Sequence, residues 1–244
     1  MPADPLHDAA RDSARGPFTP PPRREPAFNI PGIVLVFIAL CVGIHLVRAY
    51  LLTQAQDFEV ILTGAFIPAR YSGEYLIDLP ALTSPLTYSL LHGGMAHLVV
   101  NMIWLAAFGS PLAARIGPLR FALFWAATTL AAVLLHYLLH MDSSVPLVGA
   151  SGAISGMMGA AARFGFRSRR GPGRAAFEGR LLTIPEALSS RTVVTFLGVW
   201  FVINLATGLA SGMPGANGAI AWEAHVGGFL AGFLGVRLFD RRPA

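Results

Sequence analysis

Ser151 lies in the apolar, glycine-rich stretch VGASGAISGMMGA at residues 148–160, and His225 lies in a second apolar, glycine-rich stretch near the C-terminus. A serine hydroxyl becomes a useful nucleophile when a neighbouring base accepts its proton, and imidazole is the side chain that most often does so. An attacked carbonyl also needs hydrogen-bond donors at the oxygen that becomes negative. His97 and Asn101 are four residues apart, which places them on one helical face, and both can donate. These four side chains predict attack on a carbonyl through an acyl intermediate.

The glycines near the serine and the histidine also have a purely structural interpretation. Gly152 and Gly156 are four residues apart, as are Gly228 and Gly232, and such pairs of small residues let membrane helices pack closely. Taken alone, Ser151 could belong to this packing. The two interpretations are compatible, because a close crossing of the two helices would also bring the serine hydroxyl within reach of an imidazole.

The remaining polar side chains have alternatives as well. An ionisable side chain such as His225 is costly within a membrane span, so by default it indicates a polar pathway or a reactive site. His97 and Asn101 could instead form a polar clamp between helices. Ser155 lies one helical turn after the first serine, on the same face, and is a rival nucleophile. We favour Ser151, because glycines flank it more tightly.

The sequence does not favour metal-dependent or aspartyl chemistry. No HExxH motif is present, and His92 and His97, five residues apart, would not share one helical face. His136 and His140 have a spacing compatible with a metal, but no third ligand accompanies them, so we interpret them as interfacial histidines. No predicted span carries an Asp or Glu in its middle. We therefore expect neither a metal nor another cofactor.

Composition places most of the chain in a lipid bilayer. Hydrophobic residues make up 54% of the 244 residues, charged residues only 13%, and the mean hydropathy is +0.58. Six apolar windows approach the length that spans a bilayer, which predicts an all-α membrane domain with six transmembrane helices. The windows are 30–52, 94–113, 119–140, 148–164, 192–209 and 221–239. The single cysteine, Cys41, excludes an intrachain disulfide.

The arginines predict the orientation of these helices. Residues 1–28 are rich in Pro, Arg and Ala without apolar periodicity, which predicts a disordered cytoplasmic tail before a membrane domain at 29–240. Arginines lie in the tail and also follow the second, fourth and sixth helices. Their positions predict that both termini are on the cytoplasmic side of an inner (plasma) membrane. The net charge of +5 is then a topology signal, and we expect no nucleic-acid partner.

This orientation also predicts where the polar side chains lie. The second, fourth and sixth helices all run inward, and the candidate residues lie within their first turns. At ~1.5 Å of rise per residue they belong to one layer near the outer helix ends. Two outer loops could border that layer. Residues 53–91 carry aromatic side chains suited to the membrane interface, and residues 209–220 are rich in Gly and Pro, typical of a mobile cover or of an ordinary connector.

The motifs resemble those of the rhomboid family of intramembrane serine proteases. They are GASG at 149–152, HxxxN at 97–101 and AHxxGxxxG at 224–232, and FIPARY at 66–71 is similar to alpha-proteobacterial members. The resemblance implies that Ser151 is the nucleophile and His225 its base, in a dyad without a carboxylate. It implies that His97, Asn101 and the Ser151 backbone N–H stabilise the oxyanion, and that His92 shapes the site. Gly149, Gly152, Gly228 and Gly232 would support these residues.

Two positions depart from the family pattern. A glutamate usual between the glycines of FGSPLAARIG is replaced by Ala113, and an aromatic residue that stacks on the histidine in some relatives is replaced by Ser155. The resemblance implies an endopeptidase that cuts transmembrane helices of other membrane proteins near their outer ends. The alternative is a non-catalytic rhomboid-like protein that binds unstable transmembrane helices. A small transporter is a third class, but no internal repeat supports it.

Overall fold

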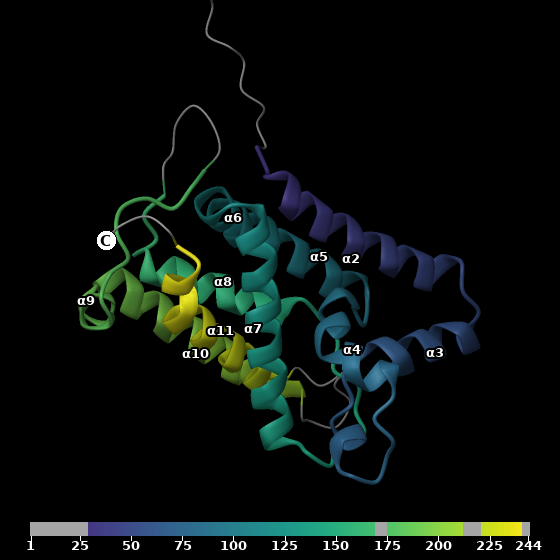
Figure 1. Ribbon diagram of the computed structural model, residues 1–244. Coiled ribbons are helices and arrows are strands. Elements are labelled where there is room, and N and C mark those ends of the chain that lie inside the picture. Colours follow the sequence, from purple (N-terminus) through teal and green to yellow (C-terminus); the bar gives the residue numbers. More distant parts are fainter. Residues whose placement is uncertain (1–28, 169–174, 212–220, 241–244) are drawn as a thin grey trace, which may run out of the picture.

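The computed structural model describes residues 29–168, 175–211 and 221–240, and the regular elements within these ranges are helices (Figure 1). The predicted tail at 1–28 and most of the predicted cover at 209–220 lie outside the described residues. The main helices are α2 (Gly32–Tyr50), α5 (Met95–Trp104), a π-helical turn η3 (Leu105–Gly109), α6 (Ser110–Ile116), α7 (Pro118–Leu139), α8 (Ser151–Arg163), α10 (Arg191–Ser211) and α11 (Trp222–Gly235). The shorter ones are α3 (Gln54–Gly64), η1 (Pro68–Tyr71), α4 (Leu79–Thr87), η2 (Tyr88–Leu90), α9 (Ile184–Ser189) and η4 (Val236–Leu238). The predicted all-α class is confirmed.

Four helical segments are long and apolar enough to cross a membrane. They are 32–50, 95–116, 118–139 and 191–208, and they coincide with the first, second, third and fifth predicted windows. The other two predicted windows contain shorter helices, since α8 has 13 residues and α11 has 14. At ~1.5 Å of rise per residue, each is only about 20 Å long. The windows were too long because hydropathy does not distinguish helical from non-helical apolar residues.

Helix α8 forms the centre of the bundle. Every residue of α8 after the first is buried, and the helix packs against both α7 and α11 (Figure 1). Glycines make this possible, because a Cβ on Gly228 or Gly232 would collide with the carbonyl oxygen of Gly152 or Gly156 respectively. A Cβ on Gly152 would lie 2.6 Å from a side-chain carbon of α7. The small residues therefore bring the backbones of α8 and α11 into direct contact.

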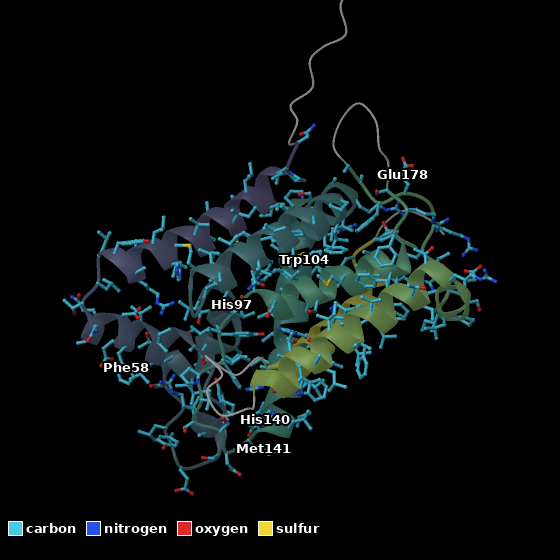
Figure 2. All side chains as sticks on the ribbon, turned by 180° about the vertical axis from the view of Figure 1, so that it is seen from behind. Phe58, His97, Trp104, His140, Met141 and Glu178 are labelled. Atoms are coloured by element: carbon cyan, nitrogen blue, oxygen red, sulfur yellow. The ribbon has the colours of Figure 1, made fainter. Side chains whose placement is uncertain are left out.

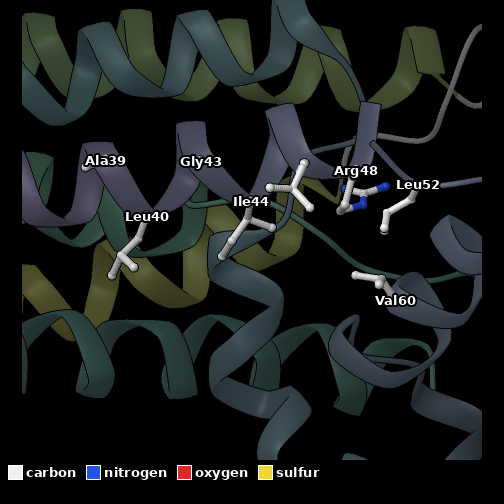
Figure 3. Close-up of a pocket in the computed structure, with 8 residues that line it drawn as sticks. Ala39, Leu40, Gly43, Ile44, Arg48, Leu52 and Val60 are labelled. Atoms are coloured by element: carbon white, nitrogen blue, oxygen red, sulfur yellow. The ribbon is translucent and has the colours of Figure 1, made fainter. Parts of the chain in front are cut away.

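Helices α2 and α10 face outward with apolar side chains. Leu35 on α2 is 49% exposed, and Val202 on α10 is 64% exposed. Apolar surface of this extent is rare on soluble proteins but is expected where lipid is the solvent. A shallow recess between α2 and α3 is likewise lined by apolar side chains, among them Leu40, Ile44 and Val60 (Figure 3). This face suits contact with acyl chains.

Two buried arginines tie the ends of the bundle together. Arg115 on α6 forms a two-pronged salt bridge with Asp240, with N···O distances of 3.0 and 2.7 Å, and both side chains are almost fully buried. Arg163, the last residue of α8, donates to the carbonyls of Leu182 and Phe233 at 3.0 and 2.8 Å. Arg163 thus joins the described part of the loop after α8 to α8 itself, and joins α8 to α11.

The segment between α2 and α5 is largely helical and supports the loop that leads into α8. Thr53 caps α3 through a capping box, and the side chain of Asp78 caps α4. Tyr88, fully buried after α4, donates its hydroxyl to the carbonyl of Thr129 on α7 at 3.0 Å. The Tyr88 carbonyl in turn accepts from the N–H of Gly149 at 3.0 Å. These bonds hold the backbone immediately before Ser151.

Candidate active site

Ser151 and His225 are in direct hydrogen-bond contact. Ser151 is the first residue of α8, and His225 is in the first turn of α11. The serine Oγ lies 2.8 Å from the imidazole Nε2, and neither side chain is fully buried. The contact follows from the glycine-mediated crossing of the two helices, which brings their N-terminal turns together. The pair can therefore transfer a proton without rearrangement.

A third residue, Asn204 on α10, completes a chain of hydrogen bonds through the imidazole. Asn204 Oδ1 lies 2.6 Å from His225 Nδ1, and Asn204 Nδ2 donates to the carbonyl of Trp222 at 3.1 Å. The second bond fixes the amide orientation, so Oδ1 accepts the Nδ1 proton. The Nε2 lone pair then faces Ser151 Oγ, as a general base requires.

Sequence reasoning missed Asn204. The signal was a single amide in the middle of an apolar span, because such a group must find a polar partner when it is buried. The amide is only 6% exposed. No spacing within one helix, however, could show that the partner was an imidazole 21 residues away on α11.

Gly149 allows His97 to approach the serine. Its φ of +128° is unfavourable for residues with a side chain. A Cβ at this position would also lie 2.8 Å from His97 Cε1, 2.9 Å from His97 Nε2 and 3.6 Å from Ser151 Oγ. The first glycine of GASG is thus required both by the backbone and by the ring that packs against it. His97 therefore lies close to Ser151.

Asn101 and His92 both contact His97. Asn101 is buried, and its Nδ2 donates to the His97 carbonyl of its own helix at 3.0 Å. The His92 ring packs edge-on against His97, with ring centroids 5.2 Å apart, and it is 1% exposed. Burial lowers the pKa of His92 to about 4, so the ring is neutral near pH 7. The structure brings His97 close to Ser151, and Asn101 and His92 contact His97.

The rival serine has a different environment. Ser155 is 5% exposed and lies one turn deeper in α8. Among the described residues, the hydroxyl that bonds His225 Nε2 is that of Ser151. Ala113, where relatives carry a glutamate, is buried on α6 in the hydrophobic core. Neither departure disturbs the contact between the serine and the histidine.

The histidines at the end of α7 do have a third polar neighbour. Glu223 Oε1 lies 2.7 Å from His136 Nδ1 and 3.0 Å from His140 Nε2. The expectation that these histidines lack a third ligand is therefore wrong. The carboxylate was not visible in the sequence because it comes from α11, more than 80 residues away.

Comparison with known proteins shows the family to which the chain belongs. A domain model described as Rhomboid domain matches residues 81–241, about two thirds of the chain. Rhomboid protease GluP of Bacillus subtilis is 29% identical over 149 residues, which cover 61% of this chain and 24% of that protein. RHOMBOID-like protein 5 of Arabidopsis thaliana is 31% identical over 145 residues, which cover 59% of this chain and 40% of that protein. The chain thus spans less than half the length of these relatives. Since the matching domain covers well over half of the chain, this multi-pass membrane protein belongs to the rhomboid family.

Proposed function

We propose that this chain is an intramembrane serine endopeptidase in which Ser151 is the nucleophile and His225 is the general base. The observation that carries the proposal is the 2.8 Å contact between Ser151 Oγ and His225 Nε2, with Asn204 Oδ1 on the opposite ring nitrogen. Family membership adds support, because a relative is named as a rhomboid protease. The arrangement has the order nucleophile, imidazole and orienting acceptor found in other serine and cysteine hydrolases.

The proposed reaction begins when His225 Nε2 accepts the proton of Ser151 as Oγ attacks a peptide carbonyl. The tetrahedral intermediate collapses when the imidazolium returns this proton to the leaving amine, and the acyl group stays on the serine. Water, deprotonated by the same imidazole, then attacks the ester and releases the second product. Asn204 stabilises the imidazolium through the Nδ1–H bond throughout.

We assign stabilisation of the oxyanion to hydrogen-bond donors near Ser151. The backbone N–H of Ser151 is at the start of α8, where N–H groups have no partner within the helix and the helix dipole favours negative charge. The His97 ring packs beside it. We assign the amide of Asn101 to the same task, which requires it to release the His97 carbonyl when substrate binds. Loss of one such donor typically costs ~10²-fold or more in rate.

The membrane arrangement that we propose has six spans, with α8 and α11 as central crossings. These two helices are shorter than a bilayer core, yet protein surrounds them on most sides, so they do not need the length of a lipid-facing helix. Both termini would be cytoplasmic in the inner membrane of a bacterium, which puts the serine near the outer surface. Substrates would be transmembrane helices of other proteins, cut near their outer ends. Local unwinding must precede attack, since a helical carbonyl is already hydrogen-bonded.

Cleavage of a transmembrane reporter in detergent tests this proposal. We expect Ser151→Ala to abolish cleavage and labelling by a fluorophosphonate probe, whereas Ser155→Ala, the matched change one turn away, retains both. Thermal unfolding of each variant controls for folding. Cleavage by Ser151→Ala at the wild-type rate would refute the assignment. Binding of the reporter by the wild type without any cleavage would favour the non-catalytic alternative instead.

A further inference from the structure

A second polar cluster lies at the outer end of α7, apart from the proposed nucleophile. His136 and His140 are four residues apart at the end of α7, and Glu223 is the second residue of α11. Nδ1 of His136, Nε2 of His140 and one carboxylate oxygen of Glu223 all lie within 4.8 Å of one another. Both rings approach the same oxygen, Oε1, at 2.7 and 3.0 Å. Three groups that can each donate a lone pair thus converge on one point.

The types of these three groups fit a Zn²⁺ ion. Two imidazoles and one carboxylate, with the fourth position open to water, form a recurring three-ligand zinc set. Zinc bonds of ~2.0–2.1 Å in a tetrahedron place the ligand atoms ~3.3 Å apart. The two N···O separations, 2.7 and 3.0 Å, are somewhat shorter than this value, and the three ligand atoms lie within 4.8 Å of one another, so a modest outward shift of the side chains would make room for the ion.

The exposure of the cluster gives an ion a path to it. The side chains of His136 and Glu223 are 10% and 5% exposed, whereas that of His140 is 46% exposed. His140 and its neighbour Met141 lie at the tip of the bundle (Figure 2). The buried side chains of His136 and Glu223 would bind the ion, and the exposed ring of His140 would be its third ligand, on the aqueous side. The fourth coordination position would then face solvent.

We propose that His136, His140 and Glu223 form a zinc site that clamps the end of α7 to the start of α11. Nothing in the Ser151 mechanism uses these residues. The clamp would act close to the base, because Glu223 precedes His225 by two residues and its neighbour Trp222 accepts the hydrogen bond from Asn204. Zinc binding would therefore stabilise the fold and restrain the first turn of α11.

Direct binding to the full chain in detergent tests the proposal without reference to cleavage. The protein is prepared without a polyhistidine tag, stripped with chelator and titrated with ZnCl₂ in a calorimeter. We expect about one ion per chain and a higher midpoint of thermal unfolding with ZnCl₂. CoCl₂ should give the visible absorption of a four-coordinate Co²⁺ site.

Variants identify the ligands. Glu223→Gln and His140→Ala should each weaken ZnCl₂ binding by about 100-fold or more and abolish the zinc-dependent rise in the unfolding midpoint. His7→Ala, which removes a histidine outside the cluster, should bind as the wild type does. If Glu223→Gln unfolds, His140→Ala still decides the question, because its ring is half exposed. Binding only at millimolar ZnCl₂, or equal binding by His140→Ala, would overturn the proposal and leave a hydrogen-bonded His–Glu–His cluster.

Discussion

Replacement of Asn204 tests whether the histidine needs an orienting acceptor. Asn204→Leu keeps the approximate volume but removes the oxygen at 2.6 Å from His225 Nδ1 and the donor at 3.1 Å from the Trp222 carbonyl. The first bond becomes charge-assisted when the imidazole holds the serine proton. Hydrogen bonds to charged groups contribute roughly 1.5–3 kcal/mol. At about 1.36 kcal/mol per factor of ten, the expected fall in kcat is ~10- to 150-fold.

The assay must separate loss of catalysis from loss of structure. We expect Asn204→Leu to lower kcat for a transmembrane reporter while KM changes little, because Asn204 contacts the base and not the substrate. Asn204→Asp, which keeps an oxygen for Nδ1–H, should retain more activity than the leucine variant. Val202→Ala changes an outward-facing residue of the same helix, which is 64% exposed, and should behave as the wild type. A folded Asn204→Leu protein with kcat within about twofold of wild type would refute the orienting role.

Three further changes test the packing and electrostatics of the fold. Gly232→Ala drives a Cβ into the backbone of α8, so it should lower the stability by about 1–3 kcal/mol and lengthen the contact between Ser151 and His225. The control Gly235→Ala, whose Cβ would meet no atom within 4 Å, should do neither. Thermal unfolding measures the first effect and fluorophosphonate labelling the second. Arg115→Leu removes the two-pronged partner of the buried Asp240 carboxylate and should destabilise the fold by roughly 3–5 kcal/mol in denaturant unfolding. An unchanged midpoint would contradict a stabilising role for this salt bridge. Burial lowers the pKa of the His92 imidazole from 6.5 to about 4, so between these pH values the unfolded chain binds a proton that the folded chain does not. The stability should therefore fall as the pH drops from 6.5 toward 4. His92→Gln should make the stability less dependent on pH in this range, and an unaltered dependence would argue against the lowered pKa.

The parts of the site that sequence could predict are those with a local pattern. GASG and the glycines after His225 have fixed spacings that favour a close helix crossing, and a close crossing is what places the histidine 2.8 Å from Ser151. Gly149 has a positive φ and a ring packed against it, so only glycine suits that position. Each of these constraints acts over a few residues, and each leaves a recognisable spacing in the chain.

The parts that sequence could not predict depend on contacts between distant helices. Asn204 is a single amide on α10, and its need for a partner did not identify His225 as that partner. Glu223 lies at the start of the sixth predicted window, and no spacing in the sequence showed that this helix begins beside the end of α7. The lengths of α8 and α11 were overestimated for a related reason. Hydropathy measures how apolar a window is, but the start of α8 is set by the turn that follows Gly149.

The hydrogen bond from Asn204 has a consequence for how the bilayer influences the reaction. Ser151 and His225 belong to the closely packed helices α8 and α11, whereas Asn204 belongs to α10, most of whose surface faces the surroundings. A change in membrane thickness that tilts α10 would move the amide relative to the imidazole and leave the serine contact intact. Turnover would then vary between lipids of different chain length even when substrate affinity and protein stability are constant.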